Sequence, residues 1–158
     1  MRVGITGHRG LPEPVEAQVR TLLARQLAAY APHDDLVAVS CLADGPDSWW
    51  AHAVLDAGGR LEVVVPAAEY RAGLPTWHHP DYDTLLARSS DAHETGLRES
   101  TSSAHQTGSE ILVGLSDEVV AVWDGLPARG YGGTADVVSY ACGTGVPVTI
   151  LWPAGATR

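Results

Sequence analysis

The chain has 158 residues, of which 45% are hydrophobic and 18% are charged, and its formal net charge at pH 7 is −9. This size and composition exclude a disordered chain and predict one domain, residues 1–158, with a buried core. The acidic charge argues against a broad surface for double-stranded DNA, which needs a basic stripe, so we expect no nucleic acid partner.

The first half of the chain alternates predicted strands and helices. Residues 2–6 (RVGIT) form an apolar strand, and a helix with an apolar stripe covers about 14–30. Residues 36–40 (LVAVS) predict a strand buried on both faces, followed by a helix from about 48 to 57 that ends at a glycine pair. Residues 61–66 (LEVVVP) predict another buried strand. This order predicts a single α/β Rossmann-like domain with a mostly parallel sheet flanked by helices.

The middle segment, residues 67–107, is richer in His, Pro, Asp, Ser and Thr. A short helix is predicted within 76–89, beginning at Pro80 or Asp81. Residues 89–103 predict a mobile loop. The HHPD stretch at 78–81 predicts a solvated loop and no metal site, because adjacent histidines do not easily share one ion.

The last third repeats the alternation. A helix is predicted over about 103–115, a strand over 117–125 with Asp124 at its end, a helix over 131–145 and a final strand over 146–153. Three loops that follow strands have unusual sequences: TGHRG at 6–10, SCLADGPD, and WDGLPARGYGGTAD. Because ligands bind at the carboxyl ends of parallel strands, we expect these loops to form one crevice.

The late loop has the composition of a phosphate-binding turn. Its glycines allow backbone amides to approach a ligand, and the following helix adds unpaired N–H groups and the positive end of its dipole. Arg9 and Arg129 are expected to supply charge-assisted hydrogen bonds to the ligand, and Asp124 is expected to accept hydrogen bonds from a ribose or a base. The alternatives without a functional role are that the glycine-rich stretch is a simple turn, that Asp44 and Asp47 only cap a helix, and that His8 only forms hydrogen bonds within its loop. The candidate ligand-binding residues are Gly7, His8, Arg9, Ser40, Asp44, Gly45, Asp47, Asp124, Arg129, Gly130, Gly132, Gly133 and Thr134.

Three stretches in order, GITGHRG, SCLADGPDSWWAHAVL and GGTADVVSYA, resemble the SLOG superfamily, which includes the Smf/DprA DNA-processing proteins and the "Lonely Guy" phosphoribohydrolases. The second stretch resembles the motif SGxAxGxD, with Cys41 in place of the first glycine. The resemblance covers residues 2–153. It implies a nucleotide or nucleotide-derived ligand held by glycine-rich loops, and a homo-oligomer.

The resemblance does not extend to the residues expected to cleave a bond. Phosphoribohydrolases carry PGGxGTxxE in the late loop, and the position of the Glu is Val137 here, with Asp136 one residue early. Their HERK-like stretch resembles residues 104–111, but the arginine position holds Thr107. Valine transfers no proton and threonine does not stabilise charge as a guanidinium does, so enzymatic activity is left open.

The function expected from these observations is binding of a phosphate-bearing nucleotide or nucleoside derivative, as a sensor or carrier module without cofactor or metal. One alternative is an N-glycosidase acting on a nucleoside monophosphate, with Glu110, Asp124 or Asp136 as the catalytic carboxylate. The others are DNA handling and a structural module. The sequence does not specify the base, the number of phosphates or the pathway.

The remaining expectations concern compartment and cysteines. The N-terminus leads directly into the strand-like VGIT without a signal-peptide core, and apolar runs are shorter than a membrane span, so we expect a cytoplasmic protein without membrane contact. Cys41 and Cys142 are expected to be reduced and buried.

Overall fold

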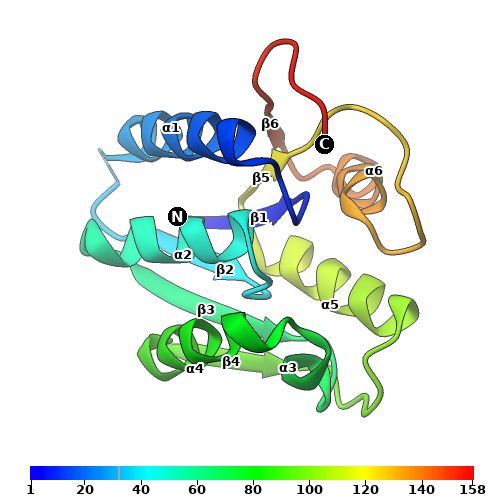
Figure 1. Cartoon of the computed structure of the whole chain (residues 1–158). Helices are drawn as coiled ribbons and strands as arrows, with labels where there is room; N and C mark the ends of the chain where they lie inside the picture. Colours follow the sequence, from blue (N-terminus) through cyan, green and yellow to red (C-terminus); the bar gives the residue numbers. More distant parts are fainter. Residues whose placement is uncertain (32) are drawn as a thin grey trace.

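The computed structural model describes residues 1–31 and 33–158, and these residues contain a six-stranded sheet (Figure 1). All five strand pairings are parallel, and the strand order is β4-β3-β2-β1-β5-β6. The predicted α/β Rossmann-like class is therefore confirmed. The strands are β1 (Arg2–Gly7), β2 (Val37–Ser40), β3 (Arg60–Val65), β4 (Asp91–Glu94), β5 (Glu118–Val122) and β6 (Val148–Leu151).

The helices form two layers, one on each face of the sheet (Figure 1). Right-handed crossovers explain this division, because the chain moves outward from β1 to β4 and then returns to place β5 on the other side of β1. One layer holds α1 (Glu13–Tyr30), α2 (Pro46–Asp56) and α4 (His79–Arg88), with the short α3 (Tyr70–Gly73) and the 3-10 helix η1 (Thr76–His78) before α4. The other layer holds α5 (Ser102–Leu115) and α6 (Thr134–Thr144).

The core lies on both faces of the central strands, where valine and isoleucine side chains are almost fully buried. Trp50 of α2 is also fully buried, and its Nε1–H donates to the Val3 carbonyl at 3.4 Å. Its neighbour Trp49 is half-buried and lies under the guanidinium of Arg20, 4.3 Å from the ring centroid. The tryptophan pair therefore connects α2 to the sheet and to α1. Among the described residues, no helix combines the length and apolar character needed to span a bilayer.

The structure corrects three expectations. Residues 91–94 form edge strand β4, although residues 89–103 were predicted to be a loop. The HHPD stretch is helical, and His78 is only 3% exposed, with Nε2 donating to the Leu42 carbonyl at 2.9 Å. Cys142 is exposed, because it lies on the outer face of α6 near its end, whereas Cys41 is buried as expected.

The strand order has one switch point, between β1 and β5. From β1 the chain crosses one face to β2, whereas from β5 it crosses the other face to β6. Gly7 and Val122, the last residues of β1 and β5, are register partners, so the two departing loops begin side by side. A Cβ on Gly7 would lie 2.8 Å from Pro46 and 2.9 Å from Val122, so the start of α2, where the loop after β2 ends, packs against the same point. Loops that diverge from such a point leave a crevice between them.

Candidate functional site

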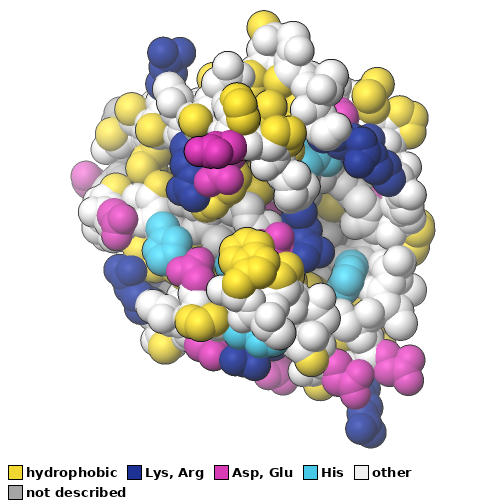
Figure 2. Space-filling view, in the orientation of Figure 1, with side chains coloured by type: hydrophobic (Ala, Val, Ile, Leu, Met, Phe, Trp, Pro, Cys, Tyr) yellow, Lys and Arg dark blue, Asp and Glu magenta, His cyan; other side chains and the backbone are white. Residues whose placement is uncertain are grey.

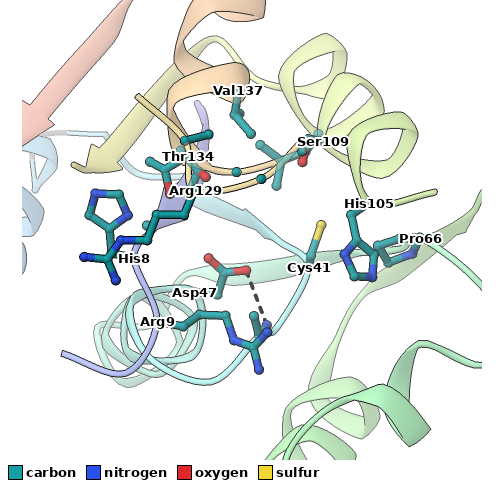
Figure 3. A pocket seen from close by; sticks show the side chains of 18 of the residues that line it. His8, Arg9, Cys41, Asp47, Pro66, His105, Ser109, Arg129, Thr134 and Val137 are labelled. Carbon is teal, nitrogen blue, oxygen red and sulfur yellow. Dashed lines mark hydrogen bonds between the residues drawn. The ribbon is translucent and has the colours of Figure 1, made fainter. Parts of the chain in front are cut away.

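A cavity of about 420 Å³ occupies this crevice (Figure 3). Its walls come from the loops after β1, β2 and β5, from α3 and the end of β3, and from one face of α5. The structure therefore brings together the three loops that were expected to share one crevice. The molecular surface is hollowed here, beside basic and histidine side chains (Figure 2). The volume lies toward the lower end of the range typical of small-molecule sites.

The glycine-rich loop forms one wall and leads directly into α6. In the described part of the chain no side chain caps the first amides of α6, and Thr134, its first residue, lines the cavity. Gly132 has a φ of +84°, and a Cβ there would lie 2.8 Å from the Ser102 carbonyl oxygen of α5. Asp136 holds this turn, because its Oδ2 accepts a hydrogen bond from the Gly132 N–H at 2.8 Å. The loop is thus packed tightly enough to require glycine, and the amide end of α6 opens into the cavity.

Three arginines line the cavity, and their charges are balanced differently. Arg9 is paired with Asp44, with Nη2 and Oδ1 2.6 Å apart. Arg158 lies beside Asp124, with Nε and Oδ2 2.8 Å apart, although these atoms are not aligned as a hydrogen bond. Arg129 is exposed, and within residues 1–31 and 33–158 its guanidinium makes no ion pair or hydrogen bond. Its positive charge is therefore available to a ligand.

His8 and Asp124 connect two of the loops. The Arg158 guanidinium donates to Nδ1 of His8 at 3.3 Å, so the ring carries its proton on Nε2 and donates it to Oδ1 of Asp124 at 3.1 Å. The Asp124 N–H lies 3.2 Å from the same Nε2, but in this tautomer that nitrogen accepts no hydrogen bond. Burial lowers the pKa of His8 and outweighs the opposing effect of its hydrogen bond to Asp124. The ring is therefore a neutral part of the cavity wall.

The loop after β2 forms the floor and is held by buried hydrogen bonds. Ser40 Oγ donates to the Asp47 carbonyl and accepts from the Leu42 N–H, both at 3.0 Å. These bonds hold Leu42 at a φ of +58°, a left-handed conformation that is rare for a residue other than glycine. Asp47 is 8% exposed and lines the cavity, and burial raises its pKa to about 7 despite a hydrogen bond from the Ala43 N–H. The strained turn thus presents a carboxyl group that is largely removed from water.

The candidate ligand-binding residues divide into two groups. Nine of them line the cavity: Gly7, His8, Arg9, Asp47, Arg129, Gly130, Gly132, Gly133 and Thr134. The other four, Ser40, Asp44, Gly45 and Asp124, lie behind the wall and orient residues that form it.

The candidate catalytic carboxylates do not line the cavity. Glu110 accepts a hydrogen bond from the Gln106 side chain at 3.3 Å, Asp136 holds the Gly132 amide and Asp124 is paired with His8. Val137, at the position of the phosphoribohydrolase Glu, does line the cavity. Thr107 donates to the Ser103 carbonyl at 3.1 Å and lies outside it. The wall at α5 and α6 therefore holds no acid or base at the two expected positions.

Several cavity residues were not among the candidate site residues, although one of them, His105, matches the histidine of the HERK-like stretch. Tyr70, Ser100, His105 and Ser109 come from the segment read as an irregular connection and from the following helix. His105 and Ser109 are spaced four residues apart, so they share a face of α5, but only the return of the chain across the switch point turns that face toward the loops. Arg158 lies far from the motifs in sequence, and no local pattern indicates its position.

The chain was compared with protein-family models, curated proteins and solved structures. No family model and no curated protein matches it. DNA processing protein A (DprA) from Streptococcus pneumoniae is similar in structure, with a TM-score of 0.68 and 19% identity over 98% of this chain. This chain covers 51% of that protein, which is about half its length.

Two further structures are similar. DNA processing protein A from Helicobacter pylori, described for its single-stranded DNA binding mode, has a TM-score of 0.69 and 18% identity, covering 100% of this chain and 68% of that chain. The molybdenum cofactor binding protein from Rippkaea orientalis has a TM-score of 0.60 and 18% identity, covering 94% and 74%. At 18–19% identity these similarities show a shared fold, and two of the three structures are DNA-processing proteins, the class that the three motifs resemble.

Proposed function

We propose that this SLOG-type domain binds a phosphate-bearing mononucleotide or nucleoside derivative and acts as a sensor or carrier. The observation that supports this most directly is the amide end of α6, which opens into the cavity beside the unpaired charge of Arg129. Backbone amides, a helix dipole and a guanidinium together match the charge and hydrogen-bonding needs of a phosphate group. Thr134 adds a hydroxyl donor at the same place.

The cavity volume favours one nucleotide over a dinucleotide. At about 420 Å³ the space is at the small end of the range for enclosed ligands, so a second nucleotide would extend into solvent. The negative net charge of the chain does not oppose phosphate binding, because the site acts through local dipoles and one nearby cation.

Binding without turnover is favoured over the N-glycosidase alternative. The carboxylates proposed for bond cleavage are each engaged with a neighbour outside the cavity wall, and the Glu position holds Val137. The molybdenum cofactor binding protein among the structural neighbours is named for binding a small ligand, which fits a binding role in this fold.

Single-stranded nucleic acid is the second candidate ligand. Tyr131 lines the cavity and is 64% exposed, next to the exposed Arg129 in the glycine-rich loop. An aromatic ring beside a basic side chain suits the stacking of an unpaired base. The DNA processing protein from Helicobacter pylori, which shares the fold, is described as binding single-stranded DNA.

Calorimetric titration and thermal unfolding test the proposal with inorganic phosphate, nucleoside 5′-monophosphates, a dinucleotide and a short oligothymidylate. A ligand bound only by the folded state stabilises it by about 2.7 kcal/mol at a hundred times its dissociation constant. We expect the monophosphates to give the largest shift and to be recovered unchanged by mass spectrometry. Loss of the base from the nucleotide would favour the N-glycosidase. A shift with the oligonucleotide alone would favour DNA handling, and no shift with any probe would refute the proposal.

A further inference from the structure

The cavity has two chemically different ends. His8 and Arg129 lie at one end, His105 and Pro66 at the other, and Asp47 and Cys41 lie between them (Figure 3). The first end contains the glycine-rich loop and is called the phosphate end. The second is called the α3–α5 end and is lined by Cys41, Pro66, Tyr70, Leu74, Ser100 and His105.

Among the residues that the structure describes, none places an unpaired charge at the α3–α5 end. Burial, and then the positive charge of Arg9, lower the pKa of His105, so its imidazole is neutral at pH 7. Burial raises the pKa of Tyr70, which keeps the phenol neutral as well. Arg9, whose charge reaches this end, is balanced by its ion pair with Asp44. A charged group placed here would lose water without gaining a partner, so this end suits an uncharged group.

The walls of this end combine apolar side chains with the polar edge of His105. The rings of Tyr70 and His105 meet edge to face, with centroids 5.6 Å apart and planes at 88°. His105 is fixed by a hydrogen bond between its Nε2 and Ser100 Oγ at 2.8 Å. Within the described part of the chain, its Nδ1 contacts no donor or acceptor. The Ser100 hydroxyl can donate to Nε2 or accept from it. In the first case Nδ1 carries the proton and can donate to a ligand, and in the second case Nδ1 can accept from a ligand.

We propose that the α3–α5 end binds the uncharged aromatic heterocycle of a nucleoside monophosphate, with Nδ1 of His105 hydrogen-bonding to the ring edge. The inference rests on the proposed function, which assigns the phosphate to the α6 end. It adds the orientation of the ligand and a specificity-determining role for His105, which was not among the candidate site residues. Asp47 lies between the two ends and would then face the sugar. Its carboxyl oxygens can accept hydrogen bonds from the sugar hydroxyls.

Calorimetric titration of the wild-type protein with inorganic phosphate, ribose 5-phosphate and the four common nucleoside 5′-monophosphates tests this assignment. The preferred nucleotide should bind about tenfold more tightly than ribose 5-phosphate, because only the nucleotide fills the apolar end and reaches His105. Equal affinity for all of them would overturn the inference and leave the phosphate end intact. No binding of any phosphate ester would refute the proposed function and the inference together.

The substitution His105→Phe separates recognition from packing. Phenylalanine keeps the ring against Tyr70 but removes Nδ1 and the hydrogen bond between Nε2 and Ser100, so the preference among the four bases should fall while the affinity for ribose 5-phosphate stays within about twofold. The matched control is His52→Phe, because His52 lies on α2 outside the cavity and pairs with Asp81. If His105→Phe weakened ribose 5-phosphate and nucleotides equally, or left base preference unchanged, His105 would not read the heterocycle.

Discussion

The imidazole of His8 and the carboxylate of Asp124 lie 3.1 Å apart and join the loop after β1 to the loop after β5. Arg158 completes the arrangement, because it contacts both residues and donates to the Pro127 carbonyl at 2.9 Å. Asp124 is only 5% exposed, so its charge depends on these neighbours for compensation. The two halves of the sheet are therefore held together at the crevice by a buried polar cluster.

Replacement of this carboxylate should destabilise the fold strongly. Asp124→Ala leaves the cation of Arg158 and the N–H of His8 without their partner, which should lower the free energy of unfolding by about 3–5 kcal/mol. Urea unfolding measures the change. The control is Asp83→Ala, which breaks an exposed, solvent-screened ion pair with Arg71 and should cost much less. Similar costs for the two variants would show that the buried cluster contributes no more than a surface pair.

The buried carboxyl of Asp47 should make stability depend on pH. Because burial raises its folded-state pKa to about 7, above the usual value of an unfolded chain, the native state keeps a proton that the unfolded state has released between about pH 4 and 7. As the pH rises from about 4 to 7, the free energy of unfolding of the wild type should therefore fall relative to that of Asp47→Asn. The difference should grow by at most roughly 4 kcal/mol and then level off. Unfolding curves that stay parallel from pH 4 to 8 would contradict this.

The glycine-rich loop should tolerate no Cβ where it packs most tightly. In Gly133→Val the new Cβ would meet that of Ala128 at 2.9 Å and displace the amide end of α6, so phosphate-ester affinity should fall by at least about tenfold while the fold remains. Gly143→Ala on the same helix faces open space, so it should bind normally and gain up to about 1 kcal/mol in stability. Calorimetry and circular dichroism check both variants, and a folded Gly133→Val with unchanged affinity would remove this loop from the site.

The unpaired guanidinium of Arg129 should contribute electrostatically to phosphate binding. Arg129→Met keeps most of the side-chain bulk and should weaken nucleoside monophosphates about tenfold, with a smaller dependence of affinity on salt. Arg25→Met, on the exposed face of α1, makes the same charge change away from the cavity. If both variants bind equally, the effect reflects net charge and not a contact.

Most of the fold followed from the apolar strands. Runs such as residues 37–40 and 119–122 are buried on both faces, and that burial is what makes them recognisable. Strand β4 was missed because its sequence, DAHE, has no apolar run, and an edge strand that pairs only with β3 needs none.

The three loops were found because glycine, aspartate and proline mark them locally. The α3–α5 wall was not, since His105 and Tyr70 become neighbours only through packing between distant elements. The contact of Arg158 with His8 joins the ends of the chain, and a pattern confined to one segment contains no information about it.

The position of β5 beside β1 also determines at which stage of folding the cavity is complete. Synthesis releases β1 to β4 before β5, so a nascent chain carries β1 as an exposed edge, with half of the crevice missing. The pairing of β1 with β5 joins segments far apart in sequence and is expected to form late. The proposed nucleotide would therefore stabilise the domain only after β5 has paired with β1, and ligand binding would report that this pairing has formed.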